Sequence, residues 1–554
     1  MDNHGLQSQR LDHLGIVAGI CNEIGLIETI DAQLPDTGRK VSVGQAVQAM
    51  VLNGLGFVSR PLYLSPEFFH NKPTELLVGA GLDAADFNDD CLGRALEQLF
   101  KQGVTEVFAA VSARALWTFG IDTKFAHLDS TSISVHGAYE CGVSDESDVS
   151  DMSAPDGEPV AVHITHGYSR DKRPDLKQAM LSLICANQAS LPVWLRVLDG
   201  NASDSTSFAD TVRAYLTQFS AEDTLPMFVA DAALYNEKTL QQLAATCRFV
   251  TRVPATLRAV KELYAQVDDE ALWVADEQTR YLEFGAYYAG VKQRWLLVLH
   301  DPSRLKQDQN LQRRVDKERL SAEKTLYTLQ NKEFGCADAV HKAVAARTKT
   351  WRYHRVDLTL YTQKRYQHPG RPAADAPFEL VWRFRGTVHE DETVIRELRR
   401  SHGKYIIASN ELDESKLGLL AMLALYKSQT SSVERGFRFL KDPLFFADSL
   451  FLKKPARIMA LLMVMGLSLL VYALAEHRVR TQLAARDQSV PDQTGKPTQR
   501  PTMRRIFQMM EGVDLLITEQ AGLRRRWLLN MTDVRWQIID LFGHHVRKLY
   551  RLGG

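Results

Sequence analysis

One stretch of the sequence, residues 458–475, limits what the chain can fold into more than any other. Its 18 positions (IMALLMVMGLSLLVYALA) carry no charged side chain. As a helix they would extend about 27 Å, which is close to the thickness of a bilayer core. Basic residues flank the stretch on both sides, so they set no membrane orientation. Because the stretch is single, a helix buried in a protein core is favoured over a membrane span.

The composition is that of a globular protein, with 45% hydrophobic and 24% charged residues. At roughly 150 residues per domain, 554 residues predict three or four domains. The 67 basic and 67 acidic side chains balance, yet residues 1–160 hold 9 Lys and Arg against 23 Asp and Glu. The remainder is therefore basic, which predicts a polyanionic partner. Widely spaced cysteines and a start without a secretory signal predict a cytoplasmic protein with free thiols.

The spacing of apolar residues changes several times along the chain. Residues 10–115 have the periodicity of helices. From residue 124, β-branched and aromatic runs predict a strand, then a hairpin (KQAMLSLICANQ and LPVWLRVLDGN), then a short strand within LPMFVADAAL. Residues 240–410 again have β character, interrupted by a charged helix over 303–330.

After these strands we expect one helix from residue 414 past 441, then the apolar helix, and finally a basic arm with a short helical tail. The arm combines several arginines with Trp527, which favours nucleic-acid contact or the pairing of subunits. Neither a Walker A loop nor the HExxH and GxSxG motifs occur. ATP-driven chemistry and the common hydrolase classes are therefore not supported.

Two aspartates follow apolar runs that read as strands. Asp129 closes FAHLD and Asp231 closes MFVAD, although Asp is disfavoured inside strands. Carboxylates from adjacent strands can share a hard cation that stabilises both charges. The alternative is that each aspartate caps the turn or helix that follows it.

The third candidate acid is Glu434, within YKSQTSSVERGFRFLKDP. On one continuous helix its face would also carry polar and basic residues at spacings of three or four: Lys427, Ser431, Arg438 and Lys441. One acid among bases can bind a metal ion and the phosphates around it. The alternative is an ordinary solvated helix face with pairs at i and i+4.

Five separated motifs carry a family resemblance. They are HLDSTSISVHG, GYSRDKRPDLKQ, LDGNASDSTSF, FVADAALYNEKTL, and VERGFRFLKDPLF followed by the apolar helix. Their order resembles that of bacterial insertion-sequence transposases of the DDE type, in particular the long Y-R-E-K type that begins with a helical domain. The resemblance extends over essentially the whole chain.

The resemblance implies an α/β fold with an RNase H-like core, a largely β insertion domain, an N-terminal helical domain and a helical C-terminal tail. Asp129 would lie on the first core strand, Asp231 on the fourth, and Glu434 on a late helix. The implied parts are 1–118, the N-terminal helical domain for DNA-end binding or dimerisation; 119–240, the first part of the core; 241–410, the insertion domain; 411–485, the second part of the core; and 486–554, the basic arm and tail.

The implied activity is DNA transposition, by metal-dependent cleavage at the element ends and strand transfer into target DNA. Two Mg²⁺ ions, with Mn²⁺ as a substitute, would be held by the three carboxylates. Asp129 would bridge both ions, while Asp231 and Glu434 would each bind one. The alternatives are an RNase H-like nuclease and a catalytically inactive DNA-binding descendant.

The implied partners are the terminal inverted repeats and target DNA, held by a homodimer in a synaptic complex in the bacterial cytoplasm at the nucleoid, without a membrane. Basic residues in two motifs are the expected DNA contacts: Arg170, Lys172, Arg173, Lys177, Arg435, Arg438 and Lys441. The sequence departs from the Y-R-E-K pattern. Lys441 matches its lysine, but Lys427 and Thr430 stand at the tyrosine and arginine positions. Arg435 and Arg438 are the candidates to replace the missing arginine.

Overall fold

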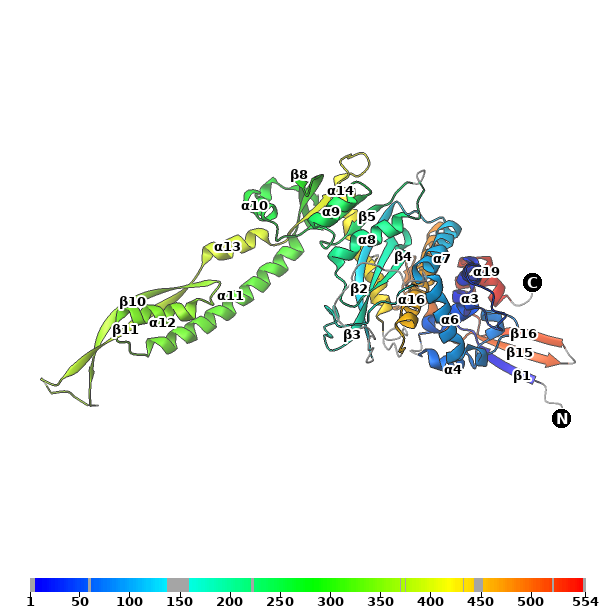
Figure 1. Cartoon of the computed structure of the whole chain (residues 1–554), viewed down its shortest axis with the longest axis horizontal. Helices are drawn as coiled ribbons and strands as arrows, with labels where there is room; N and C mark the ends of the chain where they lie inside the picture. The colour runs from blue at the N-terminus through cyan, green and yellow to red at the C-terminus, as the bar shows by residue number, and fades with distance from the viewer. Residues whose placement is uncertain are drawn as a thin grey trace. The chain divides into compact units, whose positions relative to one another are not determined.

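The computed structural model describes residues 5–57, 61–136, 159–220, 224–368, 370–373, 375–431, 433–442, 452–520 and 523–551. The chain divides into two compact units (Figure 1). The first comprises Met1–Thr251, Tyr288–Val291 and Lys416–Gly554, and the second comprises Arg252–Tyr287 and Lys292–Ser415.

Five strands form the sheet of the first unit, in the order β4-β3-β2-β5-β6. They are β2 (Phe125–Val135), β3 (Lys177–Ala186), β4 (Leu191–Leu198), β5 (Met227–Ala230) and β6 (Arg248–Val253). Neighbours among β2, β3 and β4 are antiparallel, whereas β5 is parallel to β2 and β6 is parallel to β5. This is the arrangement of an RNase H-like core, and it confirms the predicted fold class. Helices α8 (Asp204–Leu216) and α9 (Glu237–Leu243) lie in the connections around β5.

The N-terminal part is helical, as its periodicity predicts. Its helices are α1 (Leu14–Glu23), α2 (Leu26–Asp31), α3 (Val43–Leu55), α4 (Ser65–Phe69), α5 (Thr74–Leu77), α6 (Asp89–Gln102) and α7 (Val104–Phe119). A capping box begins α3, because the Ser42 side chain accepts from the Gln45 amide and the Gln45 side chain accepts from the Ser42 amide.

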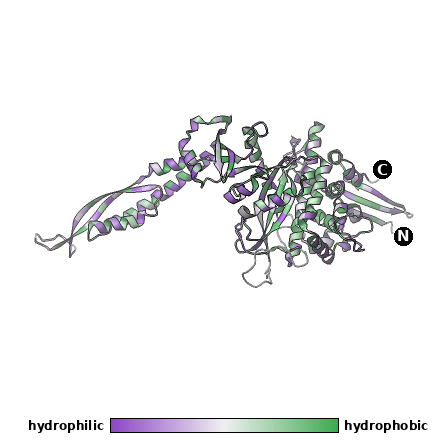
Figure 2. Ribbon diagram, turned by 45° about the horizontal axis from the view of Figure 1, so that its top comes forward, coloured by the Kyte–Doolittle hydropathy of each residue, from purple (hydrophilic) through white to green (hydrophobic). Residues whose placement is uncertain are grey.

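Helix α16 (Pro455–Ala485) contains the apolar stretch. It is the one helix of the described residues that is long and apolar enough to span a membrane, and its apolar window is completely buried. Its neighbours include α1, α3, α6, α7, β4 and two of the helices that follow it in the chain. Hydrophobic residues are frequent among the helices and strands of the first unit (Figure 2). The prediction of a buried core helix is therefore confirmed.

The C-terminal part contains strands as well as the expected helices. Its elements are β13 (Val490–Pro491), β14 (Pro497–Thr498), α17 (Met503–Met509), β15 (Asp514–Gln520), β16 (Leu523–Leu529), α18 (Asp533–Leu541) and α19 (His544–Tyr550). Strand β15 pairs with β16 and also with β1 (Gly5–Arg10), so both ends of the chain share one antiparallel sheet. This sheet was not predicted from the sequence, and part of the expected basic arm lies on β16.

Helix α19 packs tightly on α1. A Cβ atom at Gly19 would lie 2.8 Å from the Val546 Cα and 2.9 Å from its backbone nitrogen. The Tyr550 hydroxyl donates to the Asp12 carbonyl, and burial raises the pKa of Tyr550. The C-terminal helix is thus part of the core of the first unit.

The second unit contains four more strands, several helices and a β-hairpin. The sheet order is β12-β9-β8-β7, with β7 (Trp273–Asp276), β8 (Thr279–Tyr288), β9 (Val291–His300) and β12 (Lys404–Ser409). The antiparallel pair β10 (His354–Tyr366) and β11 (Phe378–Glu390) packs on α11 (Asp301–Gln330) and α12 (Ala337–Thr348). Two further helices are α10 (Arg258–Gln266) and α13 (Glu392–Ser401). The charged helix predicted over 303–330 is confirmed as α11, so the unit is richer in helix than the β character of its sequence indicates.

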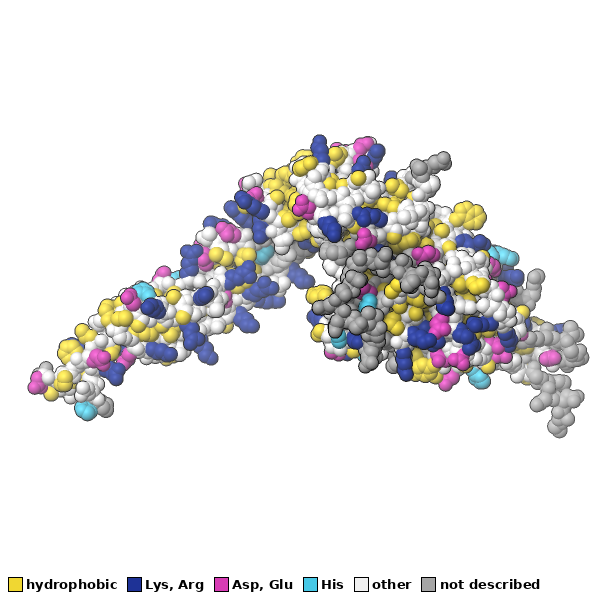
Figure 3. All heavy atoms as spheres, viewed as in Figure 1, with side chains coloured by type: hydrophobic (Ala, Val, Ile, Leu, Met, Phe, Trp, Pro, Cys, Tyr) yellow, Lys and Arg dark blue, Asp and Glu magenta, His cyan; other side chains and the backbone are white. Residues whose placement is uncertain are grey.

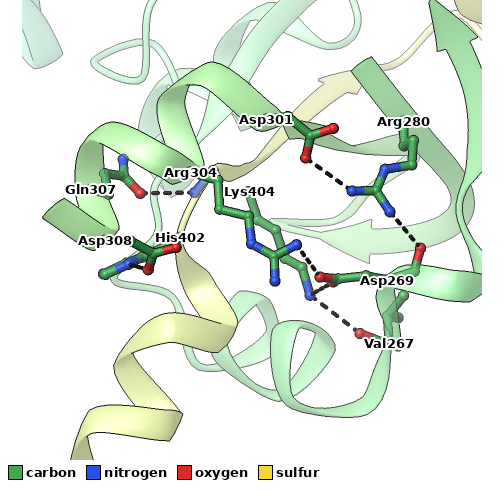
Figure 4. A network of polar contacts seen from close by, with 10 residues as sticks. Val267, Asp269, Arg280, Asp301, Arg304, Gln307, Asp308, His402 and Lys404 are labelled. Carbon is green, nitrogen blue, oxygen red and sulfur yellow. Dashed lines mark hydrogen bonds and ion pairs between the residues drawn. The ribbon is translucent and has the colours of Figure 1, made fainter. Parts of the chain in front are cut away.

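A network of ion pairs fixes the first turns of α11 within the second unit (Figure 4). Asp269 accepts from the Lys404 ammonium and the Arg304 guanidinium, each at 2.7 Å. Arg280 pairs with Asp301 at 2.9 Å. Burial alone raises the pKa of Asp269, but the hydrogen bond and charge of Lys404, with the charge of Arg304, outweigh it and hold this pKa below its usual range.

We expect Gly19→Ala to lower the free energy of unfolding by about 1 to 3 kcal/mol, because the methyl group meets the backbone of α19. Intrinsic helix propensity alone would raise the free energy of unfolding, since Ala favours a helix over Gly by about 1 kcal/mol. Urea unfolding measures the difference. Gly335→Ala is the control, because a Cβ atom there meets nothing within 4 Å. Equal stabilities of the two variants would contradict the close packing of α1 and α19.

We expect Asp269→Asn to destabilise the second unit by about 2 to 4 kcal/mol, because the Lys404 side chain is only 3% exposed and would keep a poorly compensated charge. In the wild type this stabilisation is present at neutral pH and is lost as the pH falls through the lowered pKa of Asp269. Hydrogen exchange of α11 amides measures the loss. Arg258→Gln removes only an exposed pair with Glu262 and should leave the protection unchanged.

Candidate active site

The two candidate aspartates occupy matching positions on adjacent strands. The parallel ladder between β2 and β5 ends with the pair Leu128 and Ala230, and the next residue on each side is Asp129 and Asp231. Neighbouring strands lie about 4.8 Å apart, and side chains in register point to the same face. The register therefore places Asp129 and Asp231 at neighbouring positions at this end of the ladder.

Asp129 differs from its prediction in one respect. It lies inside β2 and not at the end of the strand, because the β-branched residues after it continue the ladder with β3. Asp129 is consequently buried, with 9% exposure. Its carboxylate accepts from the Ser130 amide at 2.7 Å and lies 3.6 Å from the Arg170 guanidinium. Burial, and secondarily the Asp129 charge, raise the pKa of the Cys185 thiol.

Asp231 begins the turn that follows β5. Its carboxylate accepts from the Ala233 amide at 2.9 Å, while its carbonyl accepts from the Thr251 hydroxyl at 2.6 Å. Asp231 therefore caps the turn that follows its strand, which was the alternative to a metal-binding role.

Glu434 lies in the first turn of α15 (Val433–Leu440), and its side chain is exposed. Helix α15 packs against β2 and β3. The predicted continuous helix is wrong, because α14 (Leu419–Lys427) ends before the short helix η5 (Ser428–Ser431). Ser and Thr favour local side-chain bonds over helix continuation, and here the Ser428 hydroxyl donates to the Leu425 carbonyl at 2.6 Å. Lys427 and Ser431 therefore do not share a helix face with Glu434.

A buried polar network, which was not predicted from the sequence, joins η5 to the strand of Asp129. His127 Nε2 lies 2.9 Å from Asn187 Oδ1, and the Ser428 hydroxyl lies 2.9 Å from the same oxygen and 3.2 Å from the same nitrogen. Burial lowers the pKa of His127. A neutral ring that donates from Nε2 carries no hydrogen on Nδ1. This agrees with the lack of a partner for Nδ1 among the described residues. The only signal for this network in the sequence is His127 itself, which lies two residues before Asp129 on the same face of the strand.

Among the predicted DNA contacts of the Arg170 motif, Arg170 and Arg173 already have partners within the protein. The Arg170 guanidinium bonds to the Ser130 carbonyl, and its amide donates to the Ser132 hydroxyl at 3.2 Å. Arg173 pairs with Asp175 at 2.8 Å on the surface. Lys172 is exposed, and Lys177 begins β3. This motif therefore lies beside Asp129 and holds its own loop in place.

The cations around Glu434 divide into two groups. Lys441 pairs with Asp171 at 2.7 Å, and Arg438 is exposed. Arg435 instead pairs with Glu476, whose other oxygen pairs with Arg480 at 2.8 Å. Arg435, Arg438 and Glu476 line a cavity of about 370 Å³ whose wall also contains Phe439, Tyr472 and Arg504. Glu476 was not predicted as a functional residue, and its signal was a single acid at the end of the apolar stretch.

Three carboxylates are the donor set that a hard divalent cation prefers. Asp129 and Asp231 fit this use because they are adjacent, and Glu434 fits because its exposed side chain has no ion pair among the described residues. In the described part of the chain, however, no three His, Cys, Asp or Glu side chains are close enough to hold a metal ion.

Comparison with known families decides the chemistry. Residues 122–472, more than half of the chain, match the family model described as Transposase DDE domain. The chain belongs to the DDE transposase family. Residues 6–113 of the transposase match the model described as Domain of unknown function (DUF4277). No curated protein matches the chain.

Among solved structures, a piggyBac transposase synaptic complex with hairpin DNA aligns with 91% of this chain and 82% of that chain. The identity is 9% and the TM-score is 0.36, so this alignment transfers no residue roles. The family membership makes the chain an enzyme of DNA transposition, in a family that uses divalent metal ions.

We expect Ser428→Ala to slow metal-dependent end cleavage by roughly tenfold and to raise the metal concentration needed for half-maximal rate, because the turn before α15 loses its bonds to His127 and Asn187. Duplex affinity should not change. Single-turnover cleavage and a binding titration measure the two effects. The matched control is Ser401→Ala, which removes one bond to the Leu398 carbonyl. Cleavage of the Ser428 variant at the wild-type rate would show that the network has no positioning role.

Proposed function

We propose that the chain is a bacterial insertion-sequence transposase of the long Y-R-E-K type, and that Asp129, Asp231 and Glu434 are its catalytic carboxylates. The observation that carries this proposal is the register of Asp129 and Asp231 on adjacent parallel strands. The contact of α15 with β2 supports Glu434 as the third member. The same acids would hold two Mg²⁺ ions, or Mn²⁺ in their place.

When bound, the ions supply an activated hydroxyl nucleophile and stabilise the leaving oxygen. The residues of the chain position the DNA around that chemistry. Asp129, on the strand between β3 and β5, would bind both ions, while Asp231 and Glu434 would each bind one. The neutral His127 network holds the turn that leads to Glu434.

The proposed DNA contacts follow from the position of each cation. Exposed Arg438 and Lys172 are available to backbone phosphates, and Lys441 and Arg173 become available once they leave Asp171 and Asp175. We propose that Arg170 and Lys177, toward the two ends of the same motif, contact the same stretch of DNA. We assign Arg435 a supporting role, because its guanidinium is bound to Glu476. Arg438 is then the better candidate for the missing arginine of the Y-R-E-K pattern.

The partners follow from the activity. We propose that a homodimer binds the terminal inverted repeats and target DNA in a synaptic complex in the bacterial cytoplasm, at the nucleoid. The proposed domains are 1–118, 119–240, 241–410, 411–485 and 486–554. Packing of the C-terminal helix on α1 supports a joint role of the first and last of these segments.

The direct test replaces each acid with its amide. Asp129→Asn, Asp231→Asn and Glu434→Gln should each lower end cleavage and strand transfer by about 10³-fold, because each removes a charge that holds a metal ion. Binding to element-end DNA in EDTA should persist. The readouts are cleavage of an end substrate and transfer of a pre-cut end, both in Mg²⁺ and in Mn²⁺.

Two exposed acids of the first unit serve as matched controls, Asp210→Asn and Glu237→Gln. They should retain wild-type rates. Wild-type cleavage by any of the three active-site variants would remove that residue from the assignment. Cleavage without transfer of a pre-cut end would favour an RNase H-like nuclease instead.

A further inference from the structure

Helix α11 of the second unit has one buried face. The residues of this face are Leu311, Val315, Ala322, Leu326 and Leu329. Four of them pack into two apolar clusters, one with Val340, Val344 and Phe384, and one with Tyr353 and Ile395. At about 100° per residue the five positions fall within roughly 60° of one another around the helix axis. The opposite side of α11 is therefore free of packing contacts from these clusters.

The opposite side carries four cations in one row: Lys306, Arg313, Lys317 and Lys324. Their spacings of seven, four and seven residues keep them within about 20° of one line along the helix. All four are exposed. The row, which we call the α11 basic row, is about 27 Å long. Lys and Arg side chains gather over the second unit in the space-filling view (Figure 3).

The α11 basic row lies apart from the acids of the helix. None of the four cations of the basic row has an ion pair or side-chain hydrogen bond among the described residues. The acids of the helix lie off the row, at about 80° or more from it around the axis. Three of them have partners elsewhere, since Asp301 pairs with Arg280, Asp308 pairs with His402, and Glu318 bonds to His354. On an ordinary solvated helix face, acids and bases are mixed. The charged residues of the α11 basic row are all cations.

We propose that the α11 basic row binds the phosphate backbone of duplex DNA. The proposal rests on DNA being the substrate of the family, and it is independent of the three carboxylates because the row lies in the other unit. Each strand of a duplex presents one phosphate per about 3.4 Å of axis, so a row of about 27 Å lies along roughly eight base pairs. Exposed Asn310 flanks the row, and its side-chain amide can donate to phosphate oxygens.

The contact is independent of base sequence. Lys and Arg side chains on an exposed helix face reach phosphates without entering a groove, and binding is driven by the release of counterions. The buried face fixes the helix, so its four cations are held in line before the DNA arrives. This prealignment lowers the ordering cost of binding along a straight backbone segment.

The test is a variant in which all four cations of the row become Gln, which keeps a side chain of similar helix propensity. The full-length protein is titrated with a duplex of random sequence in EDTA at several salt concentrations. The plot of log affinity against log salt should be steeper for the wild type than for the variant by about 3 to 4, at roughly 0.9 for each phosphate that a cation neutralises. Because metal is absent, the result does not depend on whether the three carboxylates are catalytic.

The matched control changes four other exposed cations of the second unit to Gln: Lys332, Lys342, Arg347 and Lys349. Its slope should equal that of the wild type. An unchanged slope in the basic-row variant would overturn the proposal, and it is also the result expected if the row instead meets an acidic protein surface. Equal reductions of the slope in both variants would likewise overturn it, because the effect would then be one of total charge.

A second measurement needs no variant. Lysine methylation of the wild type with and without duplex, read by mass spectrometry, should show protection of Lys306, Lys317 and Lys324. The lysines of the control set should react equally in both samples. Equal reactivity of the row lysines with and without DNA would overturn the proposal even if the Gln variant failed to fold.

Discussion

The burial of α16 is the constraint on which the first unit depends. Its apolar residues can leave water only if other elements surround the helix, and those elements come from distant parts of the chain. Helices α1, α3, α6 and α7 cover it from the N-terminal part, while β4 and α15 cover it from the catalytic part. Gly466 allows the closest approach, since a Cβ atom there would lie 2.4 Å from a methyl group of Leu195 and 3.0 Å from the Phe108 ring. A single apolar helix thereby links the N-terminal helices to the sheet of the candidate site.

This link has a consequence for the acids. Helix α15 is held between α16 and the strands β2 and β3, so the position of Glu434 depends on apolar packing on one side and on the His127 network on the other. Asp129 is fixed by the ladder between β3 and β5. Burial of that carboxylate is unfavourable unless a cation compensates it, and the Arg170 guanidinium supplies the charge in the protein alone. A divalent ion at the same carboxylate would add to this compensation.

Local patterns predicted the parts of this arrangement that local sequence determines. Apolar, β-branched and aromatic runs predicted β2, β3, β4 and β5, and the parallel pairing of β2 with β5 places Asp129 and Asp231 at neighbouring register positions. The break at η5 was missed because it depends on where the Ser428 hydroxyl finds partners, and two of those lie 241 and 301 residues away in the chain. The pairing of β1 with β15 joins the two ends of the chain, and short polar strands such as GLQSQR carry little periodicity. The ordered motifs predicted the family, which neither composition nor periodicity could supply.

The ion pairs also rank the cations near the site. Lys441 and Asp171 are both partly exposed, and such a pair contributes about 0 to 1 kcal/mol, so a phosphate can replace Asp171 at little cost. Glu476 is different, because its side chain is 7% exposed and it holds Arg435 and Arg480 together with the Met503 amide. Taking Arg435 away would leave a buried charge with one partner fewer, which is far more costly than breaking a surface pair. Lys441 and Arg435, six residues apart in the chain, thus have different roles. Lys441 can exchange its partner for DNA, whereas Arg435 is fixed as part of the packing between α15 and α16.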